Sequence, residues 1–155
     1  RVTDVFTKTY YNLTPDHWDR IFEAYTILAN NNMGPKILTV AAFPEHNHYV
    51  IHMEKIIPFY PDQVLTPEQT LQIDATIAKL HSLDYAHGDL HLGNLGYRPN
   101  PDGQIDVMIL DPDTMFKISQ GFTGQEWVKD FMLDFFDDIS DFDTFVSHDL
   151  NNYKG

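Results

Sequence analysis

The sequence has 155 residues, of which 43% are hydrophobic and 14% aromatic, and this composition excludes a disordered, collagen-like or repetitive chain. A chain of this length is expected to bury about two thirds of its unfolded surface, in one domain or in two small lobes. The formal net charge of −13, with only ten Lys and Arg residues, argues against non-specific binding to nucleic acid. It favours a basic protein or a cation as partner.

The chain has no cysteine, so it forms neither disulfides nor thiolate metal sites. It also has no run of about 18 apolar residues, which predicts that no segment spans a membrane, and no signal-like segment. We therefore expect a cytoplasmic protein. Because the first residue is Arg1 rather than Met, we also expect that residues upstream of it are missing.

The N-terminal third predicts one helix among strands. Residues 2–11 are rich in Val, Thr and aromatic residues, which favours a strand, and this strand carries Lys8. Thr14 followed by Pro15 is typical of a helix start. The apolar residues after it recur at spacings of three and four, which predicts one buried face. Two further strands are expected at 36–42 and 48–53.

The second part predicts a helix, a hairpin and a final helix. Residues 66–83 begin with a capping box and have apolar residues on more than one face, which predicts a deeply buried helix. A turn around Gly103 predicts a hairpin between 94–97 and 105–110. A last helix is expected at 125–139. With a linker at 58–65, the order predicts an α+β fold, residues 1–57 forming one part and 66–155 the other.

One polar loop, His87-Gly88-Asp89-Leu90-His91-Leu92-Gly93-Asn94, follows the second predicted helix. Because a hairpin returns its second strand to the level at which the first began, we expect Asp111 to lie beside Asn94. Oxygen ligands with few protein partners suit Mg²⁺, which takes further ligands from substrate phosphates. An aspartate near such a metal, here Asp89, is a candidate to orient or deprotonate a hydroxyl.

This loop resembles the catalytic loop of the protein-kinase-like superfamily, H-x-D-L-x-x-x-N, in the form seen in aminoglycoside and choline phosphotransferases and in atypical RIO-like or lipopolysaccharide kinases. The segment Ile109-Leu110-Asp111-Pro112-Asp113 resembles the metal-binding segment that follows in that superfamily. The resemblance implies that Asp89 is the catalytic base, that Asn94 and Asp111 hold Mg²⁺, and that His91 contacts the transferred phosphoryl group of ATP.

The N-terminal half resembles the same family more weakly. Lys8 would contact the phosphates of ATP, and Glu23 on the next helix would be its ion-pair partner. Met53 would be the gatekeeper, and backbone groups of Glu54 and Ile56 would pair with adenine. The resemblance implies a minimal two-lobed kinase-like fold, with a small N-lobe sheet, one helix and a reduced helical C-lobe.

Two departures from the family pattern leave alternatives open. No G-x-G-x-x-G precedes Lys8, and only 44 residues follow Asp111. The short C-terminal part favours a protein acceptor with a Ser or Thr hydroxyl, such as a basic protein, over a small molecule such as an aminoglycoside or choline. A pseudokinase that binds without turnover, and a fragment whose missing N-terminal residues supply the glycine loop, remain alternatives.

Other polar clusters have simpler interpretations. His87 is expected to hold the loop through backbone hydrogen bonds. A zinc site at His87 and His91 is disfavoured because histidines four residues apart need a helix, which Gly88 and Gly93 oppose. Packing or solvated roles are expected for His46, His48 and His52. A solvated helix face, able to attract a basic substrate, is expected for Asp130, Asp134, Asp137, Asp138 and Asp141.

Overall fold

The computed structural model describes residues 4–155, and it is an α+β structure with small antiparallel sheets. Contacts divide the chain into two compact units. Unit 1 holds the described residues up to Ile57 together with Gly96–Pro112, and unit 2 holds Pro58–Leu95 together with Asp113–Gly155. The segment 96–112 therefore groups with the N-terminal part, which differs from the linear division between residues 57 and 66.

The first sheet of unit 1 has three antiparallel strands, in the order β1 (Val5–Tyr10), β3 (His48–Glu54) and β2 (Ile37–Phe43). More and less buried residues alternate along β3, because successive side chains of a strand point to opposite faces. A short 3₁₀ turn, η1 (Pro44–His46), joins β2 to β3. The three expected strands are thus confirmed, except that residues 1–3 lie outside the described residues.

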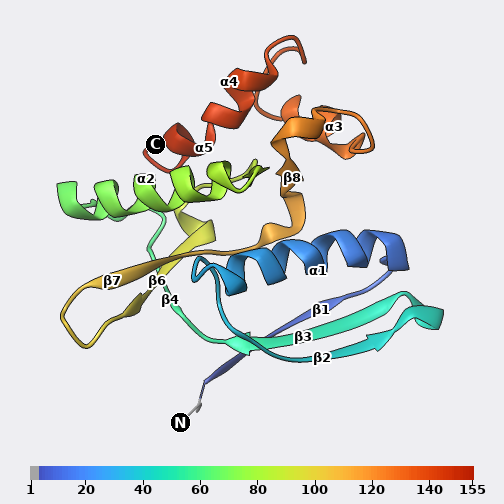
Figure 1. Cartoon of the computed structure of the whole chain (residues 1–155), viewed down its shortest axis with the longest axis horizontal. Coiled ribbons are helices and arrows are strands. Elements are labelled where there is room, and N and C mark those ends of the chain that lie inside the picture. Colours follow the sequence, from blue (N-terminus) through green and yellow to red (C-terminus); the bar gives the residue numbers. More distant parts are fainter. Residues whose placement is uncertain (1–3) are drawn as a thin grey trace. The chain divides into compact units, whose positions relative to one another are not determined.

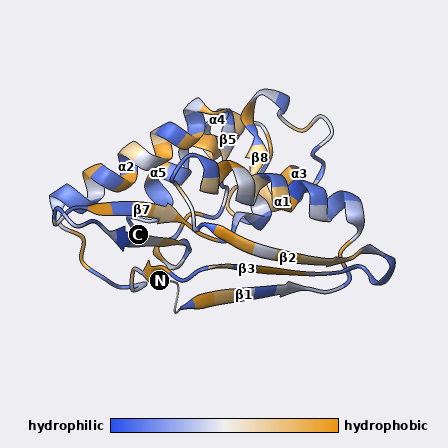
Figure 2. Cartoon of the chain, turned by 60° about the horizontal axis from the view of Figure 1, so that its bottom comes forward, coloured by the Kyte–Doolittle hydropathy of each residue, from blue (hydrophilic) through white to orange (hydrophobic). Residues whose placement is uncertain are grey.

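The helix α1 (Pro15–Asn30) lies along one face of this sheet (Figures 1 and 2). It begins as the sequence predicts, since the Thr14 hydroxyl accepts a hydrogen bond from the amide of His17 and Pro15 is the first helical residue. The residues that it buries recur at the spacing of one helical face. They are Trp18, Ile21, Ala24, Tyr25 and Leu28.

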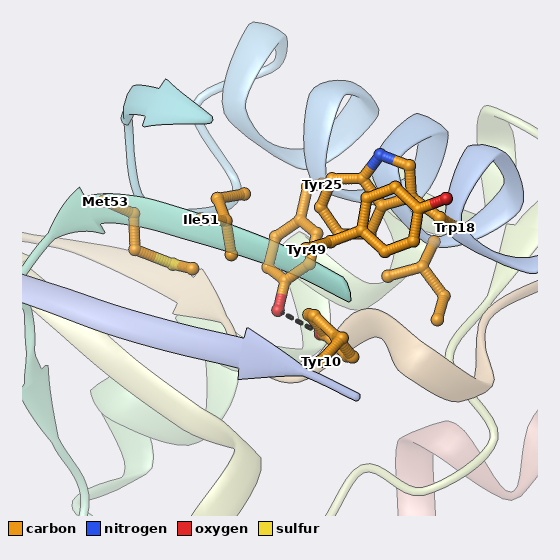
Figure 3. Packing of buried hydrophobic residues seen from close by; sticks show 7 residues of the cluster. Tyr10, Trp18, Tyr25, Tyr49, Ile51 and Met53 are labelled. Carbon is orange, nitrogen blue, oxygen red and sulfur yellow. Dashed lines mark hydrogen bonds between the residues drawn. The ribbon is translucent and has the colours of Figure 1, made fainter. Parts of the chain in front are cut away.

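Aromatic side chains form the core between α1 and the sheet (Figure 3). Trp18 stacks on Tyr49 with ring centroids 4.8 Å apart, and the hydroxyl groups of Tyr10 and Tyr25 lie 2.7 Å apart. Tyr10 and Lys8 are two residues apart on β1, so they share the strand face that carries this core. The core therefore fixes the strand segment from which Lys8 projects.

The hairpin of β6 (Leu95–Pro99) and β7 (Ile105–Ile109) turns where the sequence predicts. The amide of Asn100 donates to the carbonyl of Gln104 at 2.8 Å, and Gly103 supplies the positive φ of 85° that the turn needs. The short strand β4 (Ile57–Pro58) pairs with the other edge of β6. The amide of Ile109 donates to the carbonyl of Met33 at 2.7 Å, so the end of β7 is tied to the segment that follows α1.

In unit 2, α2 (Pro67–Ser82) starts with the predicted capping box, in which the side chains of Thr66 and Gln69 bond each other's amides. The expected deep burial is wrong. The helix buries one narrow stripe of Ile73, Ile77 and Leu80, and Leu71 is 70% exposed. Small and polar residues cover its other faces, so that apolar residues outside the stripe face water.

The single final helix expected at 125–139 is also wrong. The chain forms α3 (Trp127–Met132), a series of turns, α4 (Phe142–Ser147) and α5 (Asp149–Asn152). Like charges four residues apart, as in Asp130 with Asp134 and Asp134 with Asp138, disfavour a continuous helix. The phenylalanines instead gather around Phe145, which packs against Phe116 on β8 (Phe116–Lys117), the partner strand of β5 (Tyr85–Ala86).

Candidate functional site

The polar loop of unit 2 alternates buried and accessible side chains. His87, Leu90 and Leu92 are buried, whereas the side chains of Asp89 and His91 remain 34% and 52% exposed. The apolar residues therefore anchor the loop in the core of unit 2. Asp89 and His91 are therefore the side chains of this loop that remain accessible to solvent.

Both histidines of the loop brace its backbone in the same way. Nδ1 of His87 accepts a hydrogen bond from the amide of Asp89 at 3.1 Å, and Nδ1 of His91 accepts one from the amide of Gly93 at 3.0 Å. The loop-holding role expected for His87 is thus observed. Nδ2 of Asn94 also lies 3.3 Å from Nε2 of His91, so N–H donors face both ring nitrogens of this residue. A contact of His91 with a phosphoryl oxygen would require a protonated ring nitrogen, which donates to that oxygen.

The side chains of Asn94 and Thr114 donate hydrogen bonds to backbone carbonyls of the loop. Nδ2 of Asn94 donates to the carbonyl of Asp89 at 2.8 Å, and the hydroxyl of Thr114 donates to the carbonyl of His87 at 2.8 Å. The amide group of Asn94 is thereby oriented, with Nδ2 committed to the backbone and Oδ1 as its acceptor atom. Nε2 of His91 lies 3.9 Å from the Asp89 carboxylate, so these two side chains share one side of the loop.

Asp149 is a residue of this site that the sequence analysis missed. It is 1% exposed, and its carboxylate accepts the amides of His87 at 2.8 Å and Gly88 at 2.9 Å. Nε2 of His81, on α2, lies 2.9 Å from the same carboxylate. In the sequence Asp149 resembles one more member of an acidic C-terminal run, and no local pattern sets it apart.

Gly88 adopts a conformation that other residues rarely tolerate. Its φ is 92°, and a Cβ atom would lie 2.6 Å from the Phe131 ring. We expect Gly88→Ala to destabilise the protein through backbone strain of about 1–3 kcal/mol and overpacking of about 1–3 kcal/mol. The measurement is the urea unfolding midpoint.

Gly103→Ala is the matched control, because Gly103 has a φ of 85° but no atom within 4 Å of the position that a Cβ would take. Gly103→Ala therefore introduces the backbone strain of a positive φ but no overpacking against a neighbouring side chain. Equal losses of stability in the two variants would contradict the role assigned to Phe131.

In unit 1 the structure brings Lys8 and Asp111 together, although 103 residues separate them. Nζ of Lys8 lies 2.7 Å from Oδ1 of Asp111, and the side chains are 27% and 46% exposed. Lys8 also lies over the Tyr10 ring, 5.0 Å from its centroid. Asp111 has a φ of 52°, a left-handed conformation that non-glycine residues seldom adopt outside turns and functional sites.

The other candidates of unit 1 lie on β3, on the residues after it and on α1. Met53 is buried, Ile56 is half-buried, and Glu23 lies exposed on α1. The amide of Glu54 donates to the carbonyl of Lys36 at 3.0 Å, so an adenine contact through Glu54 would have to use its carbonyl oxygen. The Glu23 ion pair with Lys8 stays a prediction, as do the adenine contacts.

The Glu54 side chain forms an ion pair with Arg98 from β6. Arg98 donates to both carboxylate oxygens, and its guanidinium also donates to Oδ1 of Asn32 at 2.8 Å. Burial alone would raise the pKa of Glu54, but the hydrogen bonds from Arg98 and from the Lys36 amide outweigh it and hold this pKa below its usual value.

A carboxylate whose pKa is lowered on folding stabilises the protein above its unfolded pKa, about 4.3 for Glu, and loses that contribution as pH falls through the folded value. We therefore expect wild type to melt at a higher temperature than Glu54→Gln at pH 7. The difference should shrink as pH falls below about 4.3. Melting temperatures of both proteins between pH 3 and 7 test this, and a gap that is constant over that range would contradict it.

The residues predicted to bind Mg²⁺ carry side-chain oxygen atoms, the ligand type that this ion prefers. Among residues 4–155, no group of three or more His, Cys, Asp or Glu side chains is arranged to hold a metal. The two predicted ligands, Asn94 and Asp111, supply oxygen atoms, and they belong to unit 2 and unit 1 respectively. Mg²⁺ is often held by only one or two protein oxygen ligands, and it takes its other ligands from water and from nucleotide phosphates. Their joint role stays a prediction.

The cluster of His46, His48 and His52 has packing, local or solvated roles, as expected. The ring of His48 stacks on Tyr11 and on Phe43, with centroids 4.8 Å and 5.5 Å away, and His52 bonds the Thr7 hydroxyl. His46 is exposed.

The five C-terminal acids for which a solvated face was expected are exposed: Asp130, Asp134, Asp137, Asp138 and Asp141. Two of them take part in local turns. A hydrogen bond from Ser140 lowers the pKa of Asp138, and one from Thr144 lowers the pKa of Asp141, which caps α4. Within the described part of the chain, no helix combines the length and the apolar character needed to cross a bilayer.

The comparisons with known proteins supply no family. The chain matches no protein-family model, and a search of curated proteins gives no significant match.

Proposed function

We propose that the chain is an ATP-dependent phosphotransferase with a minimal two-lobed kinase-like fold. The observation that carries the proposal is the loop of residues 87–94. Its backbone is braced by His87, Asn94 and Asp149, while the carboxylate of Asp89 remains accessible. An accessible carboxylate on a backbone that neighbouring groups hold in place is the arrangement that a general base needs.

In the proposed reaction Asp89 orients the acceptor hydroxyl and accepts its proton. The hydroxyl oxygen forms a bond to the γ-phosphorus of ATP, and the bond between that phosphorus and the bridging oxygen breaks, so that ADP leaves. The rigid loop contributes by holding Asp89 in position before the acceptor arrives. His91 donates a ring N–H to the phosphoryl group.

In this proposal Lys8 contacts the phosphates of ATP, and Asn94 and Asp111 are the ligands of Mg²⁺. When bound, the ion neutralises negative charge that develops on the phosphate oxygens. Lys8 supplies a second positive charge from β1, whose position is fixed by the aromatic core of unit 1. Met53, Glu54 and Ile56 are assigned to adenine.

The acceptor is proposed to be a hydroxyl on a basic protein. Unit 2 has fourteen Asp and Glu residues against four Lys and Arg residues, so it carries −10 of the formal −13 charge. Asp89 belongs to that unit. A negative surface of this kind raises the local concentration of a positively charged acceptor.

A transfer assay tests this function. The purified protein is incubated with Mg²⁺ and ATP labelled in the γ-phosphoryl group, and with basic proteins, acidic proteins, aminoglycosides, choline or sugars as acceptors. Label on Ser or Thr of the basic proteins is the expected result. Label on a small molecule would instead identify a small-molecule phosphotransferase, and absence of transfer to every acceptor would contradict the proposal.

A further inference from the structure

The strand β2 forms one edge of the three-stranded sheet of unit 1 (Figure 1). Within residues 4–155 it pairs with β3 on one side, and its other side adjoins no further strand. The backbone amides and carbonyls on that side are therefore a template for another extended strand. Leu38, Val40 and Phe43 of β2 are 37%, 38% and 42% exposed, so this edge also offers apolar side chains.

The sequence of β2 does little to protect this edge. Natural proteins usually place a charge, a proline or a bulge on an edge strand, and β1 at the opposite edge carries Lys8. The seven residues of β2, Ile-Leu-Thr-Val-Ala-Ala-Phe, include no charge, no proline and no glycine. Their one irregularity lies near the start of the strand, between Ile37 and Thr39. Short segments of high β-propensity and low charge are typical of strands that pair with copies of themselves.

The residues that flank β2 make the strand complementary to itself. Lys36 precedes it, Pro44 and Glu45 follow it, and the side chains of Lys36 and Glu45 are exposed. In an antiparallel pair of two copies, the register that uses all seven residues places Val40 opposite its counterpart in the second copy. Lys36 of each copy then lies opposite Pro44 and beside Glu45 of the other. Opposite charges therefore meet at both ends of a neutral ladder.

We propose that β2 is a dimer interface, at which two copies of this chain pair antiparallel about a twofold axis at Val40. The two sheets then continue into each other, and the same surface is used by both copies. The formal net charge of −13 opposes the approach of two copies elsewhere, so a strand without charge is a surface on which they can meet. A single short strand buries little area, so the dimer is reversible and weak.

A single introduced thiol tests the register directly, because the chain has no cysteine. Directly opposite residues of an antiparallel pair have Cβ atoms about 4.5–5.5 Å apart, close to the separation in a disulfide. Under mild oxidation Val40→Cys should form a linked dimer about tenfold faster or more than Leu71→Cys, because pairing raises the effective concentration of the thiols. Leu71 is the control, since it is 70% exposed on α2 and lies outside the proposed interface.

Sedimentation equilibrium of the full chain measures the dimer without any cross-link. Wild type should show a reversible monomer–dimer equilibrium. Val40→Lys should weaken the dimer by about tenfold or more, because each copy then brings a lysine against the same lysine of the other. Leu71→Lys should keep the wild-type dissociation constant. Urea unfolding midpoints of both variants show whether they remain folded.

Exchange of the flanking charges tests the pairing of the ends. Lys36→Glu and Glu45→Lys should each weaken the dimer by about two- to fivefold, the range for exposed ion pairs, and the double variant should recover the wild-type constant. Failure of the double variant to recover would overturn the register.

Other outcomes would overturn the dimer itself. They are a wild type that stays monomeric at every concentration, a dimer that folded Val40→Lys leaves intact, and a Val40→Cys that is cross-linked no faster than Leu71→Cys. Open assemblies larger than a dimer would also contradict it, since a twofold pair is closed. The proposed function is tested separately, because none of these measurements uses a nucleotide.

Discussion

Asp89→Asn is expected to lower the rate of phosphoryl transfer by about 10²–10⁴-fold, the usual contribution of a general base. The asparagine side chain has nearly the same size but cannot accept the proton of the acceptor hydroxyl. Because the carboxylate of Asp89 is accessible and its backbone is held by neighbouring groups, we expect an unchanged unfolding midpoint and unchanged Mg²⁺·ATP affinity. Transfer rate, urea unfolding and nucleotide binding are measured on the same preparation.

Asp130→Asn serves as the control, since Asp130 is an exposed carboxylate of the same unit. It should retain the wild-type rate constant under saturating acceptor. Full transfer by Asp89→Asn would show that Asp89 is not the base.

Asp149→Ala is expected to reduce the free energy of unfolding by about 2–6 kcal/mol, because each buried amide that is left without an acceptor costs about 1–3 kcal/mol. The change leaves the amides of His87 and Gly88 buried without an acceptor and removes the partner of His81. Asp149→Asn keeps the volume of the side chain and one oxygen acceptor, so it should lose less stability. Urea unfolding of both variants gives the comparison.

The role of Asp149 in the site is separated from its role in stability by hydrogen exchange. In Asp149→Asn the amides of His87 and Gly88 should exchange faster, whereas amides of the aromatic core of unit 1 should not. Asp143→Asn, an exposed change on α4, should resemble wild type in both measurements. If Asp149→Asn and Asp143→Asn gave the same amide exchange rates and the same stability, the Asp149 carboxylate would not be what holds the loop.

The elements that could be predicted from the sequence are those with local causes. Thr14 with Pro15, and Thr66 with Gln69, begin helices through contacts within four residues, and both helices begin where expected. The turn at Gly103 depends on the conformational freedom of glycine at one position. The role of His87 in holding the loop depends on a hydrogen bond from the amide of Asp89, only two residues later in the chain.

The features that could not be predicted depend on partners far apart in the chain. Asp149 lies 62 residues from His87, and Asp111 lies 103 residues from Lys8. The interruption after α3 has a different origin: the spacing of the phenylalanines suits a helix, but like charges four residues apart oppose one, and the phenylalanines pack around Phe145 without it. The exposed side of α2 shows that apolar residues on several faces need not all be buried.

A calorimetric titration of the wild-type chain with ATP, with and without Mg²⁺, tests the central claim most directly. The proposed function predicts saturable binding of one nucleotide per chain in the presence of Mg²⁺, and much weaker binding in EDTA. Absence of binding in the presence of Mg²⁺ would contradict it, because the braced loop and the Lys8–Asp111 pair would then have no nucleotide on which to act.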